Sequence, residues 1–148
     1  MSLTTKGKII KIYFAGSIRG GRQLASRYGE LIELLRTYGP VLSEHIGNEK
    51  AVLRDTGLSD GEIHARDMEW MRQADLVVAE VSLPSLGVGY EIASAIALGK
   101  PVLCLYDPDS GYRLSGMISG SDKTVVRTYR NIEEAGRILS DFMQGDQE

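Results

Sequence analysis

The stretch "ADLVVAEVSLPSLGVGYEIASAIALGKPVLCLY", residues 74–106, decides the fold. It contains an apolar run at 75–82, a helical pattern at 87–98 and a second apolar run at 101–107. Nearly continuous apolar runs are typical of strands that are buried on both faces, as in a parallel sheet. Gly99, followed by a proline two residues later, ends the helical pattern between them. The stretch therefore predicts a strand, a crossover helix and a parallel strand.

The same alternation continues on both sides of this unit. Further strands are expected at residues 8–16, 40–45 and 124–129, and further helices at 22–38, 60–73 and 132–143. This alternation predicts an α/β fold with a three-layer, doubly wound, five-stranded parallel sheet in the flavodoxin-like order 2-1-3-4-5. We expect one domain over residues 1–148, with disordered ends at 1–7 and 145–148.

Composition limits the classes of function. The hydrophobic share of 43% and charged share of 25% are those of an ordinary soluble protein, and a net charge of −3 gives no general attraction to nucleic acid or to anionic membranes. The only cysteine, Cys104, lies in an apolar run, so an internal disulfide is excluded. Neither a signal peptide nor an apolar run of about 18 residues is apparent, and we expect a cytoplasmic protein without a cofactor.

Two loops are the places where a ligand is expected, because doubly wound sheets bind ligands beyond the carboxyl ends of the strands, at the switch point. The first loop is "GSIRGGR", residues 16–22, in which glycines permit close approach and Ser17, Arg19 and Arg22 supply donors. This composition suits a phosphate group, although it matches neither the Walker nor the G-x-G-x-x-G spacing. The alternative is a tight turn with solvated arginines.

The second loop, "SLPSLGVGYE", introduces an unexplained carboxylate. Glu91 is the only charged side chain between Glu80 and Lys100, and it follows a helix start that Gly87 and Gly89 leave bare of side chains. A carboxylate near a helix N-terminus stabilises the helix by about 0.3–1 kcal/mol, which is the structural alternative. The position on the ligand side of the sheet favours a functional role.

Asp67 is a second carboxylate in an apolar setting. It requires either a structural partner, such as Arg66, or a ligand. Of the two histidines, His45 at the end of a strand is a better candidate for a site residue than His64, and Tyr13 could either fill the core or turn its hydroxyl to a ligand. The stripe that Asp67 interrupts consists of Ile63, Trp70, Met71 and Ala74.

Two carboxylates beside a phosphate-type loop indicate glycosidic chemistry on a phosphorylated sugar. One carboxylate would attack or stabilise the oxocarbenium-like carbon, while a second group handles the proton of the leaving group. No metal-ligand spacing such as H-E-x-x-H is present, and the absence of G-x-S-x-G weakens a serine-hydrolase interpretation.

The segments "IYFAGSIRGGR", "LSEHI", "IHARDMEWM", residues 74–106 and "LSGMI" resemble the 2′-deoxynucleoside 5′-phosphate N-hydrolase family, within the nucleoside 2-deoxyribosyltransferase-like superfamily. The resemblance runs in colinear order from about Lys11 to Ile118. It implies a flavodoxin-like homodimer that cleaves the N-glycosidic bond of deoxynucleoside 5′-monophosphates.

The resemblance also implies roles for individual residues. Glu91 matches the nucleophile, Asp67 the carboxylate that assists leaving-group protonation and sugar orientation, and Tyr13 the hydroxyl beside that centre. His45 matches a histidine near the base, and Ser115 a serine that reaches the phosphate from the partner subunit. The phosphate cradle is matched by Ser17, Ile18, Arg19, Gly20, Gly21, Ser85 and Gly87.

Several alternatives stay open at this point. A ribonucleotide hydrolase of the CMP type and a deoxyribosyltransferase would share most of these residues. A nucleotide-binding sensor would keep the pocket without turnover, but binding a phosphate requires neither Asp67 nor Glu91. A flavodoxin-type electron carrier is the most distant alternative.

Overall fold

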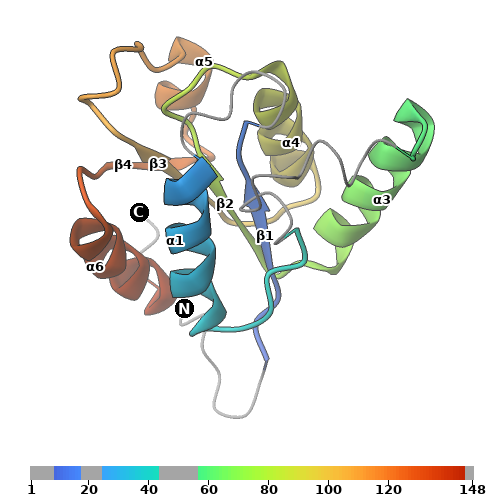
Figure 1. The fold of residues 1–148 in the computed structure, drawn as a ribbon, viewed down its shortest axis with the longest axis horizontal. Helices are drawn as coiled ribbons and strands as arrows, with labels where there is room; N and C mark the ends of the chain where they lie inside the picture. The colour runs from blue at the N-terminus through green and yellow to red at the C-terminus, as the bar shows by residue number, and fades with distance from the viewer. Residues whose placement is uncertain (1–8, 18–24, 44–56, 146–148) are drawn as a thin grey trace.

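Four parallel strands form the central sheet of the computed structural model, which describes residues 9–17, 25–43 and 57–145 (Figure 1). The strands lie in the order β1-β2-β3-β4, and each pairs with the next in parallel register. Their bounds are Ile12–Ala15 for β1, Leu76–Glu80 for β2, Val102–Tyr106 for β3 and Val125–Thr128 for β4. Each lies within a predicted strand, so four of the five predicted strands are confirmed.

The predicted strand at 40–45 is only partly represented. Val41 forms an isolated parallel bridge with Ile12, and the Leu42 N–H donates to the Ile12 carbonyl at 2.9 Å. Ile12 also pairs with Leu76 of β2, so Val41 lies on the other side of β1. Residues 44 and 45 lie outside the described residues, and the five-stranded sheet is not confirmed.

The helices occur close to the predicted positions. The structure has α1 at Ala25–Arg36, α3 at Asp60–Gln73, α4 at Leu86–Ala97 and α6 at Ile132–Met143. A four-residue helix, α5 at Gly116–Ser119, lies in a segment for which the sequence pattern was mixed. The predicted disordered ends lie outside the described residues, except Gly145, whose N–H donates to the Phe142 carbonyl.

The sheet separates two apolar clusters, one on each face. Because successive strand residues point to opposite faces, Ile12 and Phe14 of β1 join the cluster under α1 and α6, whereas Tyr13 and Ala15 join the cluster under α3 and α4. Figure 1 shows α1 and α6 in the left half of the molecule and α3 and α4 in the right half. This alternation directs the Tyr13 side chain toward the face that carries α4.

Local signals fix the ends of the two helices on that face. Ser59 and Glu62 form a capping box at the start of α3. The Ser85 hydroxyl accepts from the Val88 N–H at 3.3 Å and caps α4, while Gly99 follows that helix with a φ of 73°. Both helices therefore start at the carboxyl edge of the sheet, where their first turns flank the same space.

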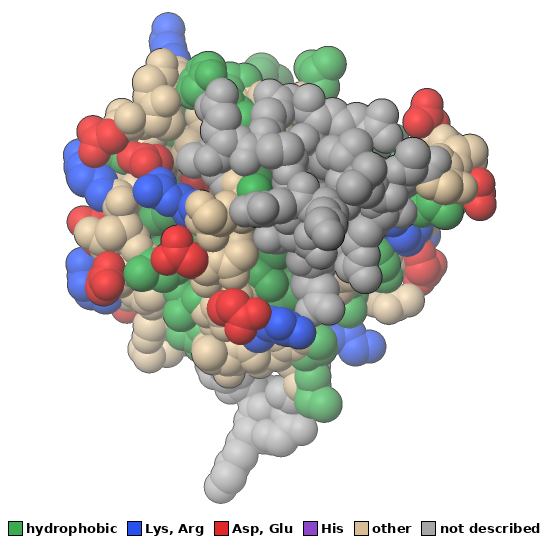
Figure 2. Space-filling model, viewed as in Figure 1, with side chains coloured by type: hydrophobic (Ala, Val, Ile, Leu, Met, Phe, Trp, Pro, Cys, Tyr) green, Lys and Arg blue, Asp and Glu red, His purple; other side chains and the backbone are tan. Residues whose placement is uncertain are grey.

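The surface of the described residues carries charges of both signs. In Figure 2, acidic and basic side chains alternate on the left of the molecule, beside α1 and α6. Cys104 is buried in β3, as expected of a small core residue. Among the residues that the structure describes, no helix has the length and apolar character needed to cross a membrane.

Candidate active site

A pocket of about 670 Å³ opens between α3 and α4 at the carboxyl edge of the sheet. Gly16, directly after β1, lines it, as do residues of the loop after β2. The two loops expected at the switch point therefore contribute to one pocket. Its lining consists of Gly16, Asp60, Ile63, His64, Asp67, Met68, Pro84, Ser85, Leu86, Gly87, Val88, Tyr90 and Glu91.

Glu91 lies within this pocket against Tyr13. The Tyr13 hydroxyl donates a short hydrogen bond to Oε2 of Glu91. Burial raises the pKa of Glu91 to about 7, with a smaller raising effect from the charge of Asp67 and an opposing effect from the hydrogen bond of Tyr13. Burial, followed by the charges of Glu91 and Asp67, raises the pKa of Tyr13, so its hydroxyl stays protonated as a donor.

Asp67 faces the same pocket from α3. The Arg66 Nε donates to its Oδ1 at 2.9 Å, so the structural partner considered from the sequence is present. The guanidinium of Arg66 also lies over the Trp70 ring, 4.8 Å from the ring centroid. Arg66 thus pairs with Asp67 while Asp67 remains on the pocket wall, and the structural and functional interpretations of this carboxylate are compatible.

The start of α4 provides the side of the pocket that suits an anion. Ser85 and Gly87 line it at the first turn, where unpaired backbone N–H groups and the helix dipole favour negative charge. Among the residues that the structure describes, a Cβ added at Gly87 would meet just the Ser85 hydroxyl, at 3.8 Å. These residues therefore leave space beside the backbone at this position, as the glycine pattern predicted.

Ser17 lies at the start of the loop that follows β1. It is buried, its N–H donates to the Tyr28 hydroxyl at 3.1 Å, and within the described part of the chain its Oγ is the one buried side-chain oxygen without a hydrogen-bond partner. A buried hydroxyl without a partner is unusual and suits a ligand oxygen. The other predicted residues of this loop, Ile18, Arg19, Gly20 and Gly21, and also His45, lie outside the described residues.

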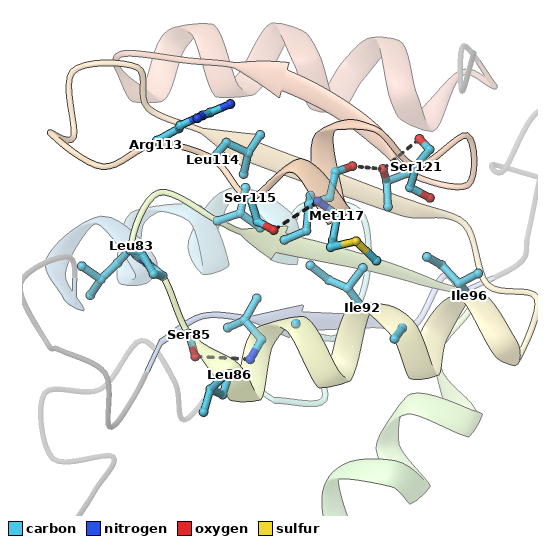
Figure 3. Close-up of a pocket in the computed structure, with 17 residues that line it drawn as sticks. Leu83, Ser85, Leu86, Ile92, Ile96, Arg113, Leu114, Ser115, Met117 and Ser121 are labelled. Atoms are coloured by element: carbon cyan, nitrogen blue, oxygen red, sulfur yellow. Dashed lines mark hydrogen bonds between the residues drawn. The ribbon is translucent and has the colours of Figure 1, made fainter.

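Ser115 is the predicted residue that the structure places elsewhere. It caps α5 by accepting from the Met117 N–H at 3.2 Å, and it lines a second pocket of about 830 Å³ between α4 and α5. Figure 3 shows Ser115 and Met117 across from Ile92 of α4, with Ser85 at one end of the same pocket. Glu91 does not line this second pocket, so within one chain Ser115 is not part of the carboxylate site.

The sequence interpretation missed Tyr90 and gave His64 little weight. The His64 Nε2 and the Tyr90 hydroxyl lie 3.0 Å apart, and both side chains line the pocket with the two carboxylates. The available signal was spacing, since His64 precedes Asp67 by one helical turn and Tyr90 precedes Glu91 directly. No group of three or more potential metal ligands occurs within residues 9–17, 25–43 and 57–145.

Comparisons with known proteins show the family of the chain. A family model for nucleoside 2-deoxyribosyltransferases matches residues 12–144. The chain is 49% identical to a 5-hydroxymethyl-dUMP N-hydrolase of Tetraodon nigroviridis, over 90% of this chain and 96% of the relative. It is also 49% identical to the 5-hydroxymethyl-dUMP N-hydrolase of Mus musculus, over 80% and 71% of the two chains.

A solved structure has a similar fold. The CMP N-glycosidase of Clostridium botulinum superposes with a TM-score of 0.62 and 20% sequence identity, covering 89% of this chain and 98% of that one. At this identity the likeness concerns the fold alone, and it agrees with an α/β architecture built on a parallel sheet.

Proposed function

This chain belongs to the nucleoside 2-deoxyribosyltransferase family, and from that premise we propose that it hydrolyses the N-glycosidic bond of a 2′-deoxynucleoside 5′-monophosphate. The products are the free base and 2-deoxyribose 5-phosphate. Two relatives that share 49% sequence identity with most of this chain are named 5-hydroxymethyl-dUMP N-hydrolases, and 5-hydroxymethyl-dUMP is a nucleotide of this class.

The observation that carries the proposal is the cluster of Glu91, Tyr13 and Asp67. Glu91 is a largely buried carboxylate that Tyr13 orients through a hydrogen bond, and Asp67 lies in the same pocket. Binding a nucleotide requires neither carboxylate, whereas glycosidic cleavage uses two. A nucleotide-binding sensor therefore leaves this cluster unexplained.

The mechanism follows from these roles. An oxygen of ionised Glu91 attacks C1′ of the sugar, the C1′–N bond breaks, and its electron pair leaves with the base, which takes up a proton from solvent on the side of Asp67. Water then attacks C1′, the C1′–O bond to Glu91 breaks, and the proton that the water loses returns to solvent, so Glu91 is released as a carboxylate and no net proton is consumed. Because the attacking form is ionised and its pKa is about 7, kcat/KM should rise as the pH rises through 7.

The phosphate anchors the substrate at a distance from the bond that breaks. We assign this task to the start of α4, through Ser85 and Gly87, and to the loop after β1, through Ser17, Ile18, Arg19, Gly20 and Gly21. Binding energy from the phosphate then orients C1′ over Glu91. A transferase that acts on unphosphorylated nucleosides has less need of such a cradle.

A homodimer would complete the site. The pocket between α4 and α5 is mostly apolar, and its rim carries Leu86 and Met117, which are 96% and 86% exposed. Ser85 borders both pockets, so a second copy seated here would bring its Ser115 near the phosphate end. Met117→Glu should yield a monomer by sedimentation velocity, and a dimer of unchanged stability would contradict this arrangement.

We also propose a fifth strand at residues 40–45, a position of His45 on the base side of the site, a single domain over residues 1–148 and a cytoplasmic location.

One assay tests the proposed function. Purified protein is given dGMP, GMP and deoxyguanosine separately, and free guanine is followed by chromatography. We expect release chiefly from dGMP. Release chiefly from GMP would favour a ribonucleotide hydrolase. Release from deoxyguanosine that requires an added acceptor base would favour a transferase. If neither monophosphate releases guanine, the proposal is refuted.

A further inference from the structure

An aromatic pair joins α3 and α4 on the wall of the carboxylate pocket. The ring centroids of His64 and Tyr90 lie 5.6 Å apart at an interplanar angle of 71°, and the His64 Nε2 is 3.0 Å from the Tyr90 hydroxyl. The two residues come from different helices, so the pair is a tertiary contact. An edge-to-face arrangement of this kind leaves part of each ring available to a further planar group.

The pair lies next to both carboxylates. His64 is one turn from Asp67 on α3, and Tyr90 adjoins Glu91 on α4. Both rings line the pocket, although Tyr90 is 56% exposed and contributes little to the core. Neither ring lines the apolar pocket between α4 and α5, so the exposure of Tyr90 is not explained by the proposed subunit contact.

The chemistry of this wall matches a nucleobase. Ile63 and Met68 add apolar surface beside the two rings. A base is a flat aromatic group with polar edges, and proteins hold such groups by stacking on aromatic side chains and by hydrogen bonds to the edges. The phosphate end of the pocket is at Ser85 and Gly87, so a sugar held at Glu91 leaves the wall on α3 for the base.

We propose that His64 and Tyr90 recognise the base of the substrate, with their rings against its face and the remaining imidazole nitrogen toward its edge. The inference rests on the proposed function and extends it to the choice of base. Since Nε2 of His64 is engaged with Tyr90, Nδ1 takes the opposite hydrogen-bonding role in the neutral ring. The direction of the His64–Tyr90 bond therefore sets whether the base meets a donor or an acceptor.

The test compares substrates with and without a base. KM is measured for dGMP, dCMP and 5-hydroxymethyl-dUMP, and 2-deoxyribose 5-phosphate is used as a competitive inhibitor that lacks the base. In Tyr90→Leu we expect KM for the best nucleotide to rise about tenfold, as for loss of one stacking contact, while the inhibition constant of the sugar phosphate is unchanged. Tyr112→Leu is the matched control, because Tyr112 is an exposed tyrosine outside this pocket.

A second variant separates the ring from the hydroxyl. Tyr90→Phe keeps the ring and frees His64, so we expect a small change in KM for the best nucleotide and an altered ranking of the bases. If Tyr90→Leu weakens the nucleotide and the sugar phosphate equally, or lowers kcat with KM unchanged, the pair only positions the helices and the inference is wrong. Absence of turnover in the wild-type protein would instead refute the proposed function.

Discussion

Two tyrosine–glutamate pairs lie on opposite faces of the same sheet. Tyr13 donates to Glu91 on the face of α3 and α4, and Tyr129 donates to Glu80 on the face of α1 and α6. Each joins a buried phenol to a carboxylate by a short hydrogen bond, and burial raises the pKa of each carboxylate. The pairs are alike in chemistry and differ in their surroundings.

Both carboxylate oxygens of Glu80 accept hydrogen bonds from neighbouring residues. Its Oε1 accepts from the Ser82 N–H at 2.7 Å, and its Oε2 accepts from the Ser82 hydroxyl at 3.0 Å and from Tyr129. Arg27 lies over the Tyr129 ring and forms an ion pair with Asp107 at 2.6 Å, so it covers the Tyr129 side of this carboxylate pair. A carboxylate whose oxygens are all occupied has a structural role.

Glu91 has the opposite surroundings. Within the described residues it accepts one side-chain hydrogen bond, from Tyr13, and the charge that acts on its pKa is that of another carboxylate, Asp67. It also borders an open pocket. The comparison teaches that the number of donors around a buried carboxylate, more than its burial, separates a reactive group from a structural one.

The largest expected effect comes from Glu91→Gln. Loss of the attacking oxygen should lower kcat by at least about a thousandfold, as for loss of a nucleophile, while binding of 2-deoxyribose 5-phosphate persists. The matched control is Glu80→Gln. The folded Glu80→Gln protein should retain most of the wild-type kcat. Full activity of Glu91→Gln in a guanine-release assay would show that Glu91 is not the nucleophile.

The same two substitutions should have the opposite order of effect on the free energy of unfolding, with the larger loss in Glu80→Gln. Glu80→Gln replaces an accepting oxygen by an amide NH₂ group that faces the donors of Ser82 and Tyr129, which should cost about 2 kcal/mol in the free energy of unfolding. Glu91→Gln keeps an acceptor for Tyr13 and should cost nothing. Urea denaturation measures both values, and equal losses would mean that both pairs are structural.

Removal of each phenolic hydroxyl sharpens the contrast. Tyr129→Phe should destabilise the protein by about 1–2 kcal/mol and leave the pH dependence of kcat/KM unchanged. Tyr13→Phe removes a hydrogen bond that lowers the pKa of Glu91, so the acid limb of the pH–rate profile should move to higher pH. An unmoved acid limb in Tyr13→Phe would mean that Glu91 does not govern it.

The last expected effect concerns the pH dependence of stability. Because the pKa of Glu91 is raised from 4.5 to about 7, the folded protein keeps a proton that the unfolded chain loses between these values. The free energy of unfolding should therefore fall as the pH rises from about 4.5 through 7. Relative to Glu91→Gln, the wild-type protein should lose on the order of 3 kcal/mol across this range, measured by urea titrations at several pH values.

The sequence predicted the fold more fully than the site. Parallel strands and crossover helices follow from apolar runs and caps, and the helix bounds of α3 and α6 are those expected. Glu80 and Glu91, however, interrupt apolar segments in the same manner, and only the structure reveals that Ser82 and Tyr129 surround the first. The contact between His64 and Tyr90 depends on the packing of α3 beside α4, which no local pattern encodes.

The first turn of α4 has a further consequence for the motions of the protein. Leu86 is almost fully exposed there, and among the described residues a Cβ at Gly87 would touch just the Ser85 hydroxyl and one at Gly89 no heavy atom within 4 Å. Ser85 caps this turn by accepting from the Val88 N–H. Glycines and few contacts make a helical turn open easily. Amide hydrogens of this turn should exchange with solvent faster than those of the second half of α4, and a bound nucleotide should slow that exchange.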